Sequence, residues 1–212
     1  MTQGPSRALP ARRTAAAHSA NARRPPRSRT PTLPHFHAVA VQILTAGGTI
    51  DKLYFDARSE YEVGEPQIRE ILREAGVTVD YDVEVVLQKD SLDLTDADRR
   101  RLAERAARTG ARQVLITHGT DTMVRTARTL EDALHSEGGA APDKTVVLVG
   151  SLSPARFKSS DAVFNIGFAT AAVQTLPPGV YLAMNGQVFR PGDVRKNHEA
   201  NRFERPDAPE ER

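Results

Sequence analysis

Apolar runs alternate with stretches of helical periodicity along most of this chain. Short, continuous, β-branched runs that suit buried strands lie at 38–44, 83–87, 113–117, 146–149 and 180–184. Between them, apolar residues recur at the spacing of a helical face, and we expect helices over 66–75, 95–110, 123–134 and 161–175. Continuous apolar strands that alternate with helices predict a mainly parallel sheet with helices on both faces.

The pattern therefore predicts a doubly wound α/β domain that begins near residue 38. We expect Thr95 and Asp161 to cap the helices that follow them. In such a sheet, ligands bind beyond the carboxyl ends of the strands. Chemistry should then lie in the segments that follow the strands, which are 45–51, 89–95, 118–122, 150–160 and 185–196.

Charge divides the chain into parts. Residues 1–40 hold seven Arg, six of the 14 Pro and no Lys or acid, so they carry +7 of a total of +2 and the rest carries −5. We interpret 1–37 as a disordered, basic tail, 38–202 as the α/β domain and 203–212 as a short polar tail. A transit-like peptide or an arm that binds an anionic surface stays open for the first segment. The net acidic domain argues against nucleic-acid binding.

Several classes of function are excluded by what the sequence lacks. There is no Cys, which rules out disulfides, thiol nucleophiles and zinc–thiolate sites. No run of 18 apolar residues exists to span a membrane, and no phosphate-binding P-loop is present. The Gly47-Gly48 pair runs into a polar segment instead of a helix, which disfavours a dinucleotide site. We expect no metal, no cofactor and a cytoplasmic location.

The segment after the first strand offers glycines and then a hydroxyl. Gly47 and Gly48 would let the backbone approach a ligand closely, and Thr49 follows them. The polar segment 52–64 carries Tyr61, twelve residues after Thr49, and a segment of this length can act as a lid. Folded back, it could bring the phenol over the hydroxyl. An ordinary exposed loop with a packed tyrosine is the alternative.

A second group of candidates follows the third strand. Backbone N–H groups near Thr120 and Asp121 lie at a helix start, where they could bind a carboxylate or an oxyanion. Asp121 could accept from a ligand ammonium or cap the helix. Lys196 could serve as a base if it were buried beside a hydroxyl and a carboxylate, whereas an exposed lysine would be a solvated cation.

Several short motifs together resemble the bacterial-type L-asparaginase family. In chain order they are Thr45-Ala46-Gly47-Gly48-Thr49-Ile50, Ser59-x-Tyr61, Asp90-Ser91-x-Asp93, His118-Gly119-Thr120-Asp121-Thr122-Met123, Val149-Gly150-Ser151-x-x-Pro154 and Val194-x-Lys196-x-His198. The likeness covers about residues 40–198. With only 16 residues after Lys196, the chain resembles the short members that lack the C-terminal domain.

This resemblance implies hydrolysis of L-asparagine to L-aspartate and ammonia, without a cofactor or a metal. It makes Thr49 the nucleophile and Tyr61 the lid phenol, and it joins Thr120, Asp121 and Lys196 in a second catalytic set. Substrate binding would fall to Ser91 at the α-carboxylate and Asp121 at the α-ammonium. Gly48, Gly119, Thr120 and Ser151 would line the same site. The resemblance also implies a dimer or tetramer.

Two positions depart from the family pattern in ways that bear on recognition of the substrate amine. Ser153, directly before Pro154, stands where an Arg is frequent. Leu92 follows Ser91, at a place where many members carry a polar residue. Two alternatives to an asparaginase therefore stay open. One is an amidohydrolase for another small amide, and the other is a module that binds an amino acid without turning it over.

Overall fold

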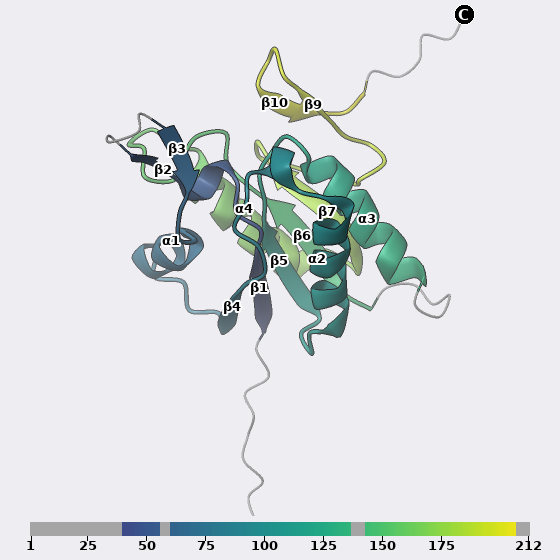
Figure 1. Cartoon of the computed structure of the whole chain (residues 1–212). Helices are drawn as coiled ribbons and strands as arrows, with labels where there is room; N and C mark the ends of the chain where they lie inside the picture. The colour runs from purple at the N-terminus through teal and green to yellow at the C-terminus, as the bar shows by residue number, and fades with distance from the viewer. Residues whose placement is uncertain (1–39, 56–59, 137–142, 207–212) are drawn as a thin grey trace, which may run out of the picture. The chain divides into compact units, whose positions relative to one another are not determined.

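The computed structural model describes residues 40–55, 60–136 and 143–206, and the basic N-terminal tail lies outside them. Its centre is a six-stranded sheet with the strand order β4-β1-β5-β6-β7-β8 (Figure 1). The strands are β1 (Val41–Thr45), β4 (Tyr81–Val85), β5 (Gln113–Thr117), β6 (Thr145–Val149), β7 (Gly179–Met184) and β8 (Gln187–Phe189). The first five are parallel and β8 is antiparallel.

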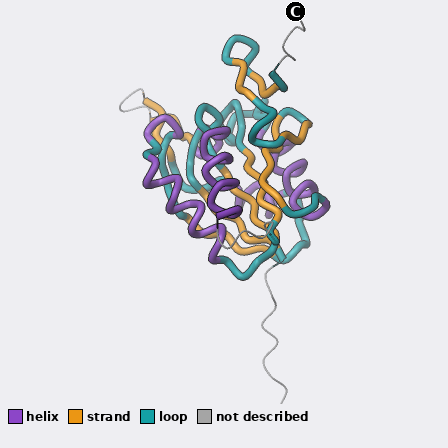
Figure 2. The backbone as a smooth tube through the Cα atoms, turned by 90° about the vertical axis from the view of Figure 1, so that its right-hand side faces the viewer, coloured by secondary structure: helices purple, strands orange, loops and turns teal. Residues whose placement is uncertain are grey.

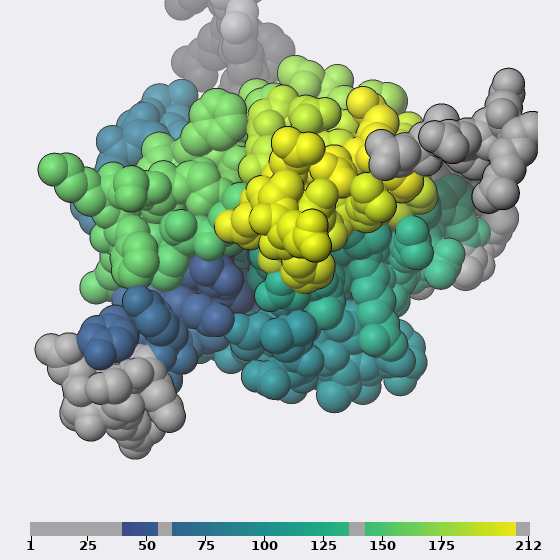
Figure 3. All heavy atoms as spheres, turned by 90° about the horizontal axis from the view of Figure 1, so that it is seen from above, coloured from purple at the N-terminus to yellow at the C-terminus, as the bar shows by residue number. Residues whose placement is uncertain are grey.

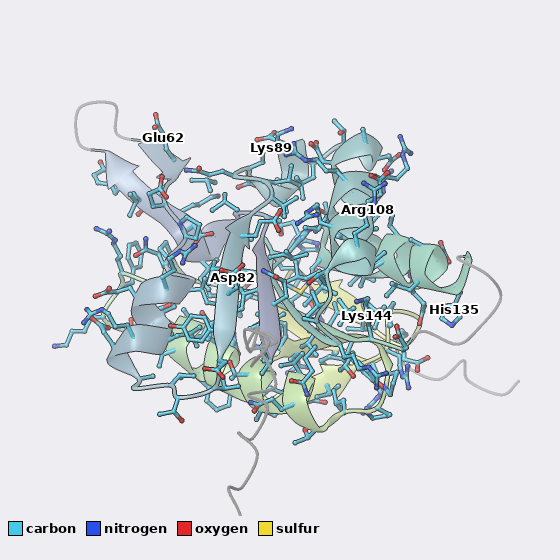
Figure 4. The ribbon with its side chains drawn as sticks, turned by 90° about the horizontal axis from the view of Figure 1, so that it is seen from below. Glu62, Asp82, Lys89, Arg108, His135 and Lys144 are labelled. Atoms are coloured by element: carbon cyan, nitrogen blue, oxygen red, sulfur yellow. The ribbon has the colours of Figure 1, made fainter. Side chains whose placement is uncertain are left out.

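Helices cover both faces of this sheet, as Figures 2 and 4 show. They are α1 (Ile68–Glu74), α2 (Asp96–Arg108), α3 (Met123–Ser136) and α4 (Ala162–Thr175). Helices α1 and α4 pack together on one face, and α2 packs with α3 on the other. The central strands are buried on both faces, because every residue of β6 and β7 is buried. This confirms the doubly wound α/β fold that the continuous apolar runs predict.

The chain winds in two directions from β1. It first passes through α1 to β4 and then crosses back through α2 to β5 on the other side of β1. The switch point of the sheet therefore lies between β1 and β5. The connections through α3 and α4 run in the same direction but on opposite faces, so their hands differ. Since such crossovers are right-handed in about 98% of cases, the β6-α4-β7 connection is an uncommon left-handed one.

Two antiparallel hairpins stand outside the sheet. Strands β2 (Lys52–Phe55) and β3 (Glu60–Val63) form one, in the segment for which we predict a loop or lid. Strands β9 (Arg195–Asn197) and β10 (Arg202–Glu204) form the other, which projects beyond the end of the sheet in Figures 1 and 2. The boundary expected at residue 202 falls inside β10, because Phe203 is buried and holds the hairpin against the domain.

The two predicted helix caps, Thr95 and Asp161, stand at the expected positions, but only Thr95 caps its helix through its side chain. Thr95 accepts from the N–H of Asp98, and the Asp98 carboxylate accepts from the N–H of Thr95, which completes a capping box. Asp161 stands at the N-cap of α4, but its carboxylate accepts from the backbone N–H groups of Leu152 and Ser153 and from the side-chain amide of Asn165, and not from the helix backbone. It thereby shapes the loop after β6. Among the described residues, no helix is long and apolar enough to cross a bilayer.

Candidate active site

Two turns touch at the switch point of the sheet. Thr49 opens a short 3-10 helix, η1 (Thr49–Asp51), after β1, and Thr120 follows β5. A Cβ atom added to Gly48 would lie 2.3 Å from the backbone N and Cα of Gly119, so the two backbones are in direct contact. The φ angle of Gly48 is 100°, which excludes other residues for a second reason. The structure thus brings the Thr49 turn and the Thr120 turn together.

Lys196 joins these turns from the β9–β10 hairpin. Its Nζ donates to Thr120 Oγ1 at 2.8 Å and lies 2.5 Å from Asp121 Oδ1. Thr120 is buried, and the Lys196 side chain is only 10% exposed. Figure 3 looks onto this end of the domain, where the yellow hairpin lies next to the purple residues that follow β1. The structure therefore brings the predicted hydroxyl, carboxylate and amine into one hydrogen-bonded set.

Ser91 packs against the same turns. It opens the 3-10 helix η2 (Ser91–Asp93), and its backbone oxygen accepts from the Thr122 hydroxyl at 2.7 Å. A Cβ atom at Gly119 would lie 2.7 Å from Ser91 Oγ. Ser91 is 1% exposed, and in the part of the chain that the structure describes its hydroxyl has no hydrogen-bond partner. A buried hydroxyl without a hydrogen-bond partner is uncommon, and it is consistent with a hydroxyl that binds a ligand.

Tyr61 and Ser151, which were also predicted to belong to the site, contact other residues. The ring of Tyr61 is half exposed and lies 5.3 Å from the ring of Tyr54 and 6.3 Å from that of Phe157. No hydrogen bond joins its phenol to Thr49 among the described residues, so its place beside the nucleophile stays a prediction. Ser151 is buried, and its hydroxyl donates to the backbone oxygen of Ser153 at 2.5 Å. Ser59 lies outside the described residues.

His118 has a structural role beside the site. Its Nδ1–H donates to Gly119 O at 2.7 Å, and its Nε2 accepts from the Thr126 hydroxyl at 2.8 Å. Complete burial lowers the pKa of His118 to about 4, so the imidazole is neutral. Both nitrogens are thus used in holding the turn. Within the described ranges, no cluster of three or more His, Asp or Glu side chains could hold a metal ion.

Two features near the site were missed by the sequence analysis. Asp51, two residues after Thr49, is 1% exposed and accepts from the N–H of Gln67 at 2.8 Å. Lys52 and Asp90 form an ion pair at 2.6 Å. Acidic and basic side chains are mostly exposed, so nothing in the sequence distinguished Asp51 and Lys52 from solvated residues, and the motif that contains Asp90 did not indicate its pairing with Lys52.

Asp51 gives the first testable prediction, which concerns stability. Burial raises the pKa of Asp51 from 3.8 to about 6, although the hydrogen bond from Gln67 lowers it. The folded state then binds more protons than the unfolded state between these values, so this group costs stability as the pH rises. The free energy of unfolding of Asp51→Asn minus that of wild type should therefore rise by about 3 kcal/mol as the pH is raised from about 3 to about 8. Urea unfolding of both proteins across this range measures the difference.

The comparison between variant and wild type matters because His118 acts in the opposite direction. Its lowered pKa makes the folded state bind fewer protons than the unfolded state between about 4 and 6.5, so its contribution to stability falls as the pH falls. The wild-type profile contains both effects, and subtraction isolates that of Asp51. A difference that stays constant with pH would show that Asp51 is ionised in the folded protein as readily as in the unfolded one.

Gly48 gives a second prediction. Gly48→Ala should lower the free energy of unfolding by about 3 kcal/mol or more, because its Cβ would collide with Gly119 and its φ is unfavourable. Gly76→Ala is the matched control, since Gly76 also has a positive φ of 62° but has nothing within 4 Å of an added Cβ. It should cost only about 1–2 kcal/mol. Equal losses in the two variants would show that the turns do not touch.

Comparison with known proteins identifies the family. Residues 40–210 match the family model described as "Asparaginase, N-terminal", which covers most of the chain. The chain therefore belongs to the asparaginase family, and the match lies in the N-terminal domain of that family.

Individual relatives agree with this assignment. The chain is 32% identical over 138 residues to the glutaminase-asparaginase of Acinetobacter glutaminasificans, a match that covers 62% of this chain and 38% of that protein. It is 33% identical over 155 residues to one subunit of the glutamyl-tRNA(Gln) amidotransferase of Pyrobaculum aerophilum, covering 68% and 34%. The crystal structure of a probable cytoplasmic L-asparaginase from Campylobacter jejuni matches with a TM-score of 0.65 and 31% identity, covering 79% and 53%. The chain thus spans about a third to a half of the length of these proteins.

Proposed function

We propose that this protein hydrolyses the side-chain amide of L-asparagine to give L-aspartate and ammonia. The observation that carries the proposal is the contact of Lys196 Nζ with both Thr120 Oγ1 and Asp121 Oδ1, beside the turn that presents Thr49. A hydroxyl is a poor nucleophile at its free pKa, and a base must remove its proton. The hydrogen-bonded set of Thr120, Asp121 and Lys196 would accept this proton beside the turn that presents Thr49.

The proposed reaction has two steps. In the first, the Thr49 hydroxyl adds to the amide carbon and its proton passes to the Thr120, Asp121 and Lys196 set. The set returns this proton to the amide nitrogen, the C–N bond breaks, and ammonia leaves behind a threonyl ester. In the second, water adds to the threonyl ester, releases L-aspartate and restores the Thr49 hydroxyl. Backbone N–H groups of the Gly48 and Gly119 turns suit the developing oxyanion. No cofactor enters the proposed reaction.

Substrate binding is proposed at the residues around these turns. The buried, unpartnered hydroxyl of Ser91 would donate to the substrate α-carboxylate, and Asp121 would face the α-ammonium. Tyr61 would close over Thr49 from the β2–β3 hairpin. Ser151 would contribute through its backbone, because its hydroxyl is used by Ser153.

Two broader properties are also proposals. The exposed Val163 and Phe164 on α4, 57% and 62% exposed, support assembly into a homo-oligomer. The name of the Campylobacter jejuni relative, a probable cytoplasmic L-asparaginase, supports a cytoplasmic location.

Ammonia release from L-asparagine by the purified full-length chain tests the proposal. L-glutamine is measured in parallel, because the Acinetobacter glutaminasificans relative is named a glutaminase-asparaginase. Heat-inactivated protein is the control for spontaneous hydrolysis. Faster release from L-asparagine supports the proposal. Release from L-glutamine alone would favour another small amide as substrate, and binding of aspartate without release from any amide would favour an amino-acid-binding module.

A further inference from the structure

Asp51 joins three segments of the chain at the base of the β2–β3 hairpin. Its N–H donates to Gly48 O at 3.1 Å, which closes the turn that presents Thr49. Its backbone oxygen accepts from the N–H of Gly64 at 2.8 Å, directly after the hairpin ends. Its carboxylate accepts from the N–H of Gln67 at 2.8 Å, one residue before α1. One residue therefore holds the Thr49 turn, the hairpin and the start of α1 together.

The two ends of the hairpin are packed closely at this base. A Cβ atom added to Gly64 would lie 2.5 Å from the Leu53 side chain and 3.4 Å from Asp51 O. Arg156, in the loop after β6, donates from Nε to the side-chain oxygen of Gln67 at 3.0 Å. The residue that donates to the Asp51 carboxylate is thus itself held by a further segment of the chain.

A carboxyl group at this position costs stability when it is ionised. Asp51 is 1% exposed, and within the described residues its Oδ2 has no hydrogen-bond partner. Burial raises the pKa of Asp51 to about 6, and the negative charge of Glu65 adds to this effect. Four more charged side chains on the segments that meet here are bound to other groups; they are Lys52, Arg69, Glu70 and Arg156. A buried acid whose charge is not neutralised, two residues after Thr49, calls for a functional reason.

We propose that Asp51 is a positioning residue, which holds the Thr49 turn and the base of the β2–β3 hairpin in the arrangement that the proposed reaction needs. It acts through Thr49 and through the hairpin that carries Tyr61, and it touches no substrate atom itself. This inference rests on the proposed function, because it takes Thr49 as the nucleophile and Tyr61 as the phenol that closes over it.

The charge of Asp51 then sets how often the base of the hairpin opens. An open base exposes the carboxyl to water, where its ordinary pKa of 3.8 favours the carboxylate. The closed base favours the neutral acid, because burial raises the pKa to about 6. Raising the pH from about 5 to about 8 should therefore increase the ratio of open to closed base about tenfold. The arrangement around Thr49 is thus most stable at mildly acidic pH.

Amide hydrogen exchange of the full chain, read by NMR, tests this without any turnover. The protection factors of the Gly64 and Gln67 N–H groups should fall about tenfold between about pH 5 and about pH 8. Asp51→Asn keeps an oxygen that can accept from Gln67 and removes the titration, so its protection factors should not change with pH. The N–H of Phe203 is the matched control, because it donates at 2.9 Å to the side-chain oxygen of Asn185, which does not titrate. Protection in wild type that does not change with pH, an equal fall at Phe203, or the same fall in Asp51→Asn would overturn the proposal.

Kinetics test the positioning of the nucleophile. Asp51→Val removes the acceptor and leaves the N–H of Gln67 without its partner. We expect kcat for L-asparagine to fall about 10- to 100-fold, the cost of a misplaced catalytic group. The Kd of L-aspartate, measured by calorimetry, should stay unchanged, because Ser91 and Asp121 are held by other contacts. Asp51→Asn should restore the kcat of wild type.

The outcomes separate this role from the proposed function. A wild-type kcat in Asp51→Val would overturn the positioning role, and so would an equal loss of kcat in Asp51→Asn. If Asp51→Val does not fold, exchange in wild type and Asp51→Asn decides the question. If wild type releases no ammonia from any amide, the proposed function fails, and exchange at Gly64 and Gln67 still shows whether Asp51 holds the base of the hairpin. If wild type turns over L-asparagine and this exchange does not depend on the charge of Asp51, the role of Asp51 fails alone.

Discussion

Thr49→Val is expected to lower ammonia release from L-asparagine by about 10⁴-fold or more while the protein stays folded. Valine has the shape of threonine without the hydroxyl, so the half-buried position at the start of η1 is filled as before. Loss of a nucleophile removes the covalent route, and only binding and oxyanion stabilisation then remain. The steady-state rate of ammonia release at saturating L-asparagine measures the effect.

The control for Thr49→Val is the same substitution far from the site. Thr170 lies in α4, where its hydroxyl donates to the backbone oxygen of Ile166 within the same helix. Thr170→Val should keep the rate of wild type. If Thr49→Val retained a tenth or more of the wild-type rate, another group would have to be the nucleophile.

Lys196→Met is expected to give the second-largest loss, about 10²- to 10⁴-fold in kcat, the usual range for a proton-transfer group. Its ammonium is the hydrogen-bond partner of both Thr120 and Asp121, so its removal takes away the cation of the set and leaves the carboxylate unpaired. Binding should change less, because the residues proposed to hold the α-carboxylate and α-ammonium stay in place. Kinetics over a range of L-asparagine concentrations separate kcat from KM.

Lys144→Met is the matched control for a lysine with two short hydrogen bonds. Lys144, labelled in Figure 4, precedes β6 at the opposite end of the sheet and donates to the backbone oxygens of Thr109 and Ala111. Its loss should lower the free energy of unfolding by about 1–3 kcal/mol and leave kcat unchanged. A similar fall in kcat for both lysine variants would mean that stability, and not proton transfer, limits the activity of Lys196→Met.

The sheet was predictable from the sequence because its strands are buried on both faces. The apolar run at 146–149 and the capping box at Thr95 are local signals, and both agree with the structure. Strand β9 carries no such signal, since Arg195–Asn197 is polar, and the apolar residue that is buried in this hairpin, Phe203, lies in its partner β10. Strand β8 could have been found. Asn185-Gly186, both with positive φ, is the usual two-residue hairpin turn.

The candidate site was predictable only as a set of residues. Spacing and resemblance singled out Thr49, Thr120 and Lys196, but the contact of Gly48 with Gly119 depends on the strand order, which no local pattern gives. The left-handed connection through α4 is equally non-local. Asp51 and the Lys52–Asp90 pair were missed because their burial arises from tertiary packing of residue types that are normally solvated.

The position of Lys196 near the end of the sequence has a consequence for the synthesis and the proteolysis of the protein. Every strand of the central sheet precedes it in the sequence, so a chain emerging from the ribosome can complete the sheet before the amine of the site has been made. The connection that carries it includes Gly192 and Asp193, both exposed and therefore open to a protease. A single nick there would cut the covalent link between the sheet and the amine, which would then be kept in the site only by the packing of Phe203 and by its bonds to Thr120 and Asp121. We expect the proposed activity of a nicked chain to be lost more easily than its fold.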